Sequence, residues 1–272
     1  MEPLTIAIIV AVFTLIVLFS GIPIAFGLSF VSIALLVAFE GVQMLDVFAE
    51  TFYAGLNSFV LLSIPMFILM GMAVANSPAG KDLYTGLDRW LWRVPGGLVI
   101  SNIGACSIFA ALSGSSPATC AAIGTMGIPE MRKRGYSDEI ATGTIAAGGT
   151  LGVLIPPSIV LIVYGLATGT SIGRLFLSGI IPGFMLASLF ALWALFHSYF
   201  IDKTSSKALR NKKPPTLKQK LEVLPRIFPF LAIIIGVLYV LYGGVATPSE
   251  ASGVGAFLVF VMIAIVYKIY QP

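Results

Sequence analysis

The chain has 272 residues, of which 58% are hydrophobic and only 10% are charged. Soluble domains carry about 45–50% apolar and about 25% charged residues, so 16 Lys and Arg with 12 Asp and Glu are too few to keep this chain in water. The net charge of +4 fits Lys and Arg gathered in cytoplasmic loops, and we expect no nucleic-acid partner. The composition predicts an all-α polytopic membrane protein embedded in a lipid bilayer.

Nine apolar stretches follow one another along the chain. They cover residues 4–20, 22–39, 59–75, 95–112, 117–129, 139–168, 175–201, 227–243 and 251–267. Basic residues cluster between these stretches, whereas the segment 40–58 carries only acidic charges. By the positive-inside rule, the basic clusters face the cytoplasm and 40–58 faces outward. The pattern predicts about seven crossings plus one re-entrant hairpin, with the N-terminus outside and the C-terminus of this chain in the cytoplasm.

The segment 94–131 is expected to be the re-entrant hairpin. Basic residues flank it on both sides, so it must cross the membrane an even number of times, yet it barely suffices for two helices of about 20 residues each. Its middle holds the poor helix formers Ser113-Gly114-Ser115-Ser116-Pro117. Because loop backbone cannot face lipid, the tip must be buried in protein or line a watery cavity.

The segment 138–170 is too long for one tidy helix and is interrupted at Ile155-Pro156-Pro157-Ser158. Glycines precede the interruption in Gly148-Gly149-Thr150-Leu151-Gly152. Two prolines remove two amide donors and clash with the preceding turn. We expect a discontinuous helix here, the alternative being a mere kink at the prolines.

Residues 202–220 are polar and basic and are interpreted as a linker. The spans 227–243 and 251–267 that follow resemble the opening pair but point the opposite way, as at the start of an inverted-topology repeat. The expected organisation is therefore N-terminal scaffold spans (1–93), a transport-type hairpin and broken helix (94–170), a span with the basic linker (171–226) and an incomplete second repeat (227–272).

The two interruptions are the candidate ion and substrate site. Half-helix N-termini attract anions, and unwound carbonyls coordinate hard cations such as sodium. Apart from Glu139 at the start of 139–168, no Asp, Glu, Lys or Arg lies within a predicted span. Proton relays use buried carboxylates or histidines, so a site of neutral oxygens favours Na⁺. The candidate residues are Ser113, Gly114, Ser115, Ser116, Thr119, Gly149, Thr150, Gly152, Ile155, Pro156 and Pro157, with Ser113, Ser115, Gly149, Thr150 and Ile155 as Na⁺ ligands.

An enzyme is not expected. The serine-rich tip could suggest an intramembrane serine hydrolase, but such a nucleophile needs an activating base. His197 is the single histidine and lies far along the chain. The sequence has no metal-ligand spacing and no Walker-type phosphate loop, and no cofactor is expected besides the coupling ion.

The runs Ala111–Thr119 and Gly149–Ser158 closely resemble the large membrane subunit of tripartite ATP-independent periplasmic (TRAP) transporters, of the dicarboxylate and sialic-acid type. The resemblance implies a Na⁺-coupled importer of small organic anions in the bacterial inner membrane. It implies two partners, an extracytoplasmic solute-binding protein and a small four-helix membrane subunit. It further implies an elevator motion in which Ser113–Ser116 and Thr119 form the first hairpin tip and Gly149–Pro157 the first broken helix.

The chain ends at Pro272 without a second serine-rich tip or a second proline break. This departure predicts a fragment or truncated product, or a second half supplied by another chain. The alternatives left open are a carboxylate elevator that needs no binding protein and an inactive truncated membrane scaffold.

Overall fold

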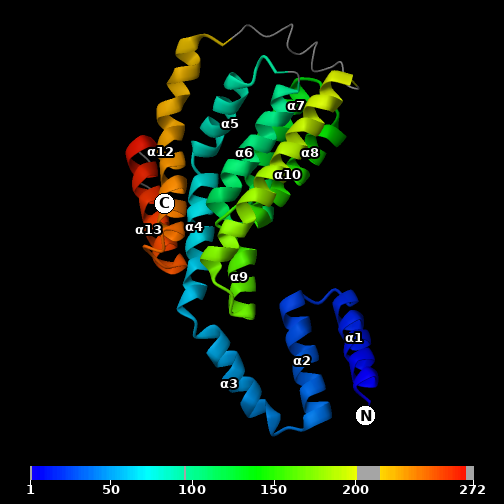
Figure 1. Cartoon of the computed structure of the whole chain (residues 1–272). Coiled ribbons are helices and arrows are strands. Elements are labelled where there is room, and N and C mark those ends of the chain that lie inside the picture. The colour runs from blue at the N-terminus through cyan, green and yellow to red at the C-terminus, as the bar shows by residue number, and fades with distance from the viewer. Residues whose placement is uncertain (1, 95, 201–214, 268–272) are drawn as a thin grey trace. The chain divides into compact units, whose positions relative to one another are not determined.

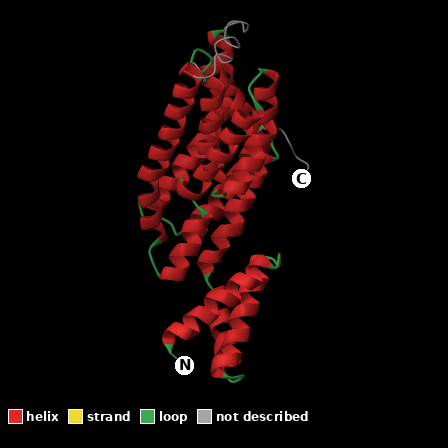
Figure 2. Cartoon of the chain, turned by 90° about the vertical axis from the view of Figure 1, so that its right-hand side faces the viewer, coloured by secondary structure: helices red, strands yellow, loops and turns green. Residues whose placement is uncertain are grey.

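The computed structural model describes residues 2–94, 96–200 and 215–267. Within these residues the chain consists of helices joined by short turns and has no β-strand, as Figure 2 shows. The predicted all-α class is therefore confirmed. The chain divides into two compact units, Met1–Ser58 and Phe59–Pro272.

The first unit holds α1 (Pro3–Phe19), α2 (Ile24–Glu40) and α3 (Met44–Leu56). The chain reverses between α1 and α2 through Gly21, whose φ is 80°. Gly27 of α2 lies against Val17 of α1, since a Cβ added to Gly27 would lie 3.2 Å from Val17 Cγ1. Large apolar side chains such as Phe19 stay exposed in this unit, as expected of helices that face lipid.

The second unit surrounds the hairpin with helices. Its elements are η1 (Phe59–Leu62), α4 (Ser63–Ala75), α5 (Ala79–Trp90), α6 (Gly97–Ser113), α7 (Ser116–Lys133), α8 (Asp138–Leu154), α9 (Ile159–Thr168), α10 (Ile172–Phe200), α12 (Leu217–Tyr242) and α13 (Pro248–Tyr267). Helix α6 packs against α4, α7, α8 and α10 (Figure 1). The core lies along these contacts, where Phe67, Phe109 and Phe176 are completely buried.

Three helical segments in the described residues are long and apolar enough to cross a membrane. They are Asp138–Thr168, which holds α8 and α9, then Ile172–Phe200 and Pro248–Tyr267. The number rises to five if each of two bent helix pairs forms one span. Helices α1 and α2 are shorter apolar helices of 17 residues each. Seven crossings require these two as well, so that number stays a prediction, as do the inverted repeat and the orientation of the termini.

The start of α12 differs from the expected linker 202–220. The helix begins at Leu217 rather than near 227. Thr216 and Gln219 form a capping box, in which the Thr216 N–H donates to Gln219 Oε1 at 3.0 Å. The expected span 227–243 coincides with the second part of this helix, Ile227–Tyr242. The polar turns before it were assigned to the linker because hydropathy does not detect them, whereas capping and helix propensity decide where a helix begins. The rest of the expected linker, 201–214, lies outside the described residues.

Candidate functional site

The turn between α6 and α7 forms the hairpin tip. Helix α6 ends at Ser113, and Gly114 caps it in the left-handed region with φ 60° while its N–H donates to the Ala110 carbonyl at 2.8 Å. Ser115 is extended, and α7 begins at Ser116 with Pro117 in its first turn, where proline is favoured. The two helices therefore reverse direction within two residues (Figure 1). Two helices thus meet in a turn at the serine-rich run, as predicted, and the re-entrant path of this hairpin through the membrane stays a prediction.

The hydroxyl groups of the tip form a small buried network. Ser113 Oγ lies 3.1 Å from Thr119 Oγ1, and Thr119 Oγ1 donates to the Ser115 carbonyl at 2.8 Å. Ser113 and Thr119 are 1% and 0% exposed. Ser116 Oγ is buried and has no hydrogen-bond partner among the described residues. Buried hydroxyls of this kind are normally hydrogen-bonded, so the tip has spare polar capacity.

The predicted break in the long helix is also confirmed. Helix α8 ends at Leu154, and the backbone is extended at Ile155 and Ser158 before α9 begins. Pro156 and Pro157 have no N–H, so the carbonyls of Gly152 and Val153 lack the donors that a continuous helix would supply. The segment is therefore discontinuous rather than kinked.

The tip and the break lie in direct contact. The Ile159 N–H donates to the Gly114 carbonyl at 3.0 Å. A Cβ added to Gly114 would lie 2.6 Å from the Pro157 carbonyl oxygen, and one added to Gly152 would lie 2.7 Å from the Ser115 carbonyl carbon. Glycine is required at 114 and 152 because the backbones approach so closely.

Gly149 and Thr150 occupy different surroundings. Gly149 faces the thiol of Cys120, and an added Cβ there would lie 3.4 Å from the Ser116 carbonyl oxygen. Thr150 is exposed, and its hydroxyl donates to the Ala147 carbonyl of its own helix at 2.7 Å. The structure thus brings the other candidate residues to one junction and leaves the Thr150 hydroxyl outside the tip network.

Sequence reasoning missed the glycines that hold the junction from other helices. A Cβ on Gly71 of α4 would lie 2.7 Å from Ser113 Cα. On α10, a Cβ added to Gly179 would lie 2.5 Å from the Leu154 carbonyl oxygen, and one added to Gly183 would lie 3.1 Å from Ile155 Cγ1. The spacing of Gly179 and Gly183 is the small-xxx-small pattern of close helix packing in membranes, a signal that could have found them.

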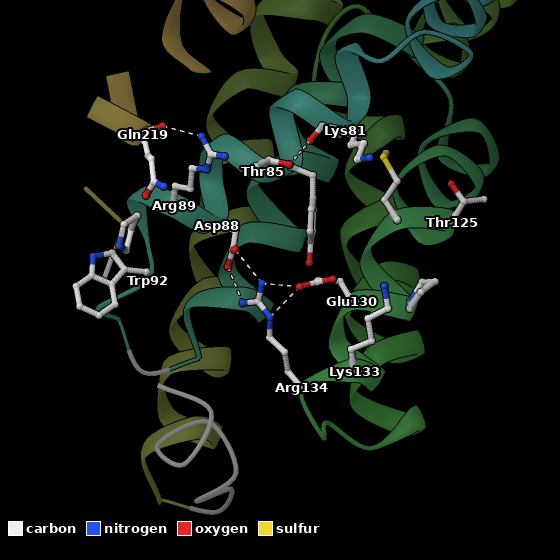
Figure 3. Close-up of a pocket in the computed structure, with 14 residues that line it drawn as sticks. Lys81, Thr85, Asp88, Arg89, Trp92, Thr125, Glu130, Lys133, Arg134 and Gln219 are labelled. Carbon is white, nitrogen blue, oxygen red and sulfur yellow. Dashed lines mark hydrogen bonds and ion pairs between the residues drawn. The ribbon is translucent and has the colours of Figure 1, made fainter. Parts of the chain in front are cut away.

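A second polar feature lies where α5, α7 and the start of α12 meet (Figure 3). Arg134 donates to both carboxylate oxygens of Asp88, at 2.8 and 2.9 Å, and to Glu130 Oε1 at 2.7 Å. Burial alone lowers the pKa of Arg134, but the hydrogen bonds and charges of Asp88 and Glu130 raise it above its ordinary value. In the sequence, Arg134 belongs to a cluster of basic residues that indicates only topology, and nothing in its spacing points to Asp88.

Comparison with known proteins places the chain in a family. Residues 9–271 match the family model described as Tripartite ATP-independent periplasmic transporter, DctM component. The chain belongs to this family. The motifs of the hairpin and the break therefore identified the TRAP large permease correctly.

Relatives of this DctM-family chain include three transport proteins with different named substrates. The C4-dicarboxylate TRAP transporter large permease protein DctM of Vibrio cholerae is 38% identical over 93% of this chain and 54% of that protein. The isethionate TRAP transporter permease protein DctMQ of Oleidesulfovibrio alaskensis is 36% identical over 91% of this chain and 38% of its own length. The sialic acid TRAP transporter large permease protein SiaM of Vibrio cholerae is 32% identical over 92% of this chain and 57% of that protein.

The chain spans about half the length of the curated relatives it matches. Those relatives are transporter permease subunits and not enzymes, in agreement with the expected class of function. Their substrates differ, so membership of the DctM family does not by itself choose a substrate.

Proposed function

We propose that this chain forms part of the membrane permease of a Na⁺-coupled secondary importer of organic anions, such as C4-dicarboxylates or sugar acids, in a bacterial inner membrane. The observation that carries the proposal is the junction at which the Ile159 N–H binds the Gly114 carbonyl. It joins two interruptions of helical backbone, and transporters build ion and substrate sites from such interruptions near the middle of the bilayer. Membership of the DctM family supports the same function.

Sodium is the coupling ion that suits this junction. The junction offers the hydroxyls of Ser113 and Thr119 and the carbonyls of Gly152 and Val153, all of them neutral oxygens. No charged residue occurs in 97–129 or in 140–173, so α6, most of α7, most of α8 and all of α9 lack the carboxylates on which intramembrane proton relays depend.

The remaining parts of the proposal follow from the family. We assign to the permease two partners, an extracytoplasmic solute-binding protein that delivers the anion and a small four-helix membrane subunit. The segment 94–170 acts as the moving, transport-type domain, and the other membrane helices form the scaffold.

Transport in proteoliposomes tests the function. The chain is assembled with the rest of its permease and the small subunit, the solute-binding protein is added outside, and uptake of a labelled C4-dicarboxylate is recorded under a Na⁺ gradient or a proton gradient. We expect uptake only with an inward Na⁺ gradient. Equal uptake driven by a proton gradient alone would overturn the assignment of the ion, and uptake without the solute-binding protein would instead favour a carrier that needs none.

A further inference from the structure

A cavity of about 540 Å³ lies between α5, α7 and the first turn of α12 (Figure 3). No residue of the hairpin tip lines it. Three chain segments line it, and its lining includes Lys81, Tyr84, Arg89, Lys133, Arg134 and Gln219. None of the candidate ion and substrate residues lines this cavity.

The cavity carries a surplus of positive charge. The two carboxylates that line it, Asp88 and Glu130, are both bound by Arg134. Three further cations line the cavity, and Lys81 and Lys133 form no ion pair with any residue that the structure describes. Arg89 donates to the Gln219 carbonyl at 2.7 Å, which is a neutral acceptor. Four cations and two carboxylates therefore line the cavity, so its described lining residues carry a net charge of +2.

A buried donor faces the same cavity. Tyr84 is 6% exposed and lines the cavity, yet its hydroxyl has no hydrogen-bond partner in the described part of the chain. Burial, followed by the charge of Asp88, raises the pKa of the Tyr84 phenol above its ordinary value, so it stays a neutral O–H donor. Buried polar groups are nearly always hydrogen-bonded, so this hydroxyl indicates an acceptor that the described residues do not supply.

The setting of the cavity fits a membrane surface. Helix α5 buries Leu83 and Tyr84 while Lys81 and Trp90 on the same helix are exposed. Trp92 lines the cavity, and tryptophan is enriched at the level of lipid headgroups. Basic pockets beside membrane helices bind acidic headgroups.

We propose that this cavity binds a phosphate group, and that an acidic phospholipid such as phosphatidylglycerol supplies it. Lys81 and Lys133 balance the charge of the phosphate, and the Tyr84 O–H donates to one of its oxygens. Arg134 offsets one of the two negative charges of Asp88 and Glu130, and the three other cations of the lining outweigh the remaining one. This site stands independently of the transported substrate and of the coupling ion.

Lipid binding by lysine variants tests whether the positive charges of Lys81 and Lys133 contribute to phosphate binding. The purified chain in detergent is titrated with labelled phosphatidylglycerol, and the dissociation constant is compared among variants. Each lysine near an acidic lipid contributes about fivefold in affinity, so Lys81→Gln combined with Lys133→Gln is expected to weaken binding about 25-fold. Lys218→Gln is the matched control, because Lys218 is an exposed cation on the first turn of α12 that does not line the cavity. Equal weakening by the control and the double variant would overturn the site.

Tyr84→Phe tests the hydroxyl alone. We expect weaker binding of phosphatidylglycerol, by about fivefold for one lost hydrogen bond, with an unchanged or higher melting temperature of the lipid-free chain. The melting temperature does not fall because the substitution removes a buried polar atom that has no partner. A fall in melting temperature with unchanged lipid affinity would assign the hydroxyl a purely structural role and overturn its part in the site.

The source of the phosphate is distinguished by competition. Binding of phosphatidylglycerol that exceeds binding of phosphatidylcholine and resists millimolar inorganic phosphate supports the lipid. Displacement by inorganic phosphate at low concentration would overturn the lipid assignment and make free phosphate the ligand of the same residues.

Discussion

At the scale of single residues, Gly114 combines two constraints, of which Gly169 meets only one. Its φ of 60° lies in the left-handed region, and an added Cβ would lie 2.6 Å from the Pro157 carbonyl oxygen. Gly169 caps α9 with a similar φ of 66° but has nothing within 4 Å of an added Cβ. The two positions therefore separate the conformational cost of a side chain from its steric cost.

Gly114→Ala is expected to destabilise the chain by about 3 kcal/mol, because left-handed strain adds to a clash with fixed backbone. Gly169→Ala has only the strain and is expected to cost about 1 kcal/mol. Thermal unfolding in detergent measures both changes. Equal losses at the two positions would contradict the close contact between the tip and the break.

The Ser113 hydroxyl is expected to contribute to Na⁺ affinity. Ser113→Ala should raise the Na⁺ concentration for half-maximal uptake about fivefold, which corresponds to one net hydrogen bond or ligand of about 1 kcal/mol. Ser101 is a matched control on the same helix, because it is 0% exposed and its hydroxyl donates to the Gly97 carbonyl at 2.7 Å. If Ser101→Ala has the same effect as Ser113→Ala, the sodium site lies elsewhere.

At the scale of helices, the sequence predicts where the two interruptions lie but not that they contact each other. Adjacent prolines at 156 and 157 and the glycine and serines at 113–116 oppose helix through local chemistry, so both breaks could be predicted. The bond between Ile159 and Gly114 joins segments that lie 45 residues apart, and no local pattern specifies that pairing. The same reason hid the contact of Gly71 with Ser113 and the binding of Arg134 to Asp88.

The ion pair between Arg134 and Asp88 connects α5 to the C-terminal end of α7, the second helix of the hairpin. Asp88→Asn is expected to destabilise the chain by about 2 kcal/mol, because it leaves a largely buried guanidinium with Glu130 as its single carboxylate. The pair of Arg132 with Asp138 has side chains 56% and 68% exposed, so Arg132→Gln is expected to change stability by less than about 0.5 kcal/mol. Thermal unfolding measures both, and comparable losses would show that the Asp88 pair does not clamp the two helices.

At the scale of the whole molecule, the orientation of the hairpin is the feature that a single labelling experiment decides. Glu50 lies in the acidic segment expected outside, and Lys133 lies in the basic cluster expected in the cytoplasm; both are exposed. In intact cells, an impermeant maleimide should label Glu50→Cys but not Lys133→Cys, which should react only after the cells are opened. Labelling of the unsubstituted chain gives the background, because the native Cys106 is buried and Cys120 is partly buried. Labelling of Lys133→Cys from outside would contradict the re-entrant path.

The bond that joins the tip to the break is formed by backbone atoms alone, the Ile159 N–H and the Gly114 carbonyl. Side chains beside it, such as those of Ser115 and Ser116, can therefore be exchanged without cutting the link between the two elements. Relatives in this family are named for C4-dicarboxylates, isethionate, ectoine and sialic acid. Because the joint consists of main-chain atoms, we expect substitutions of the side chains around it to change selectivity without breaking the connection between the two elements.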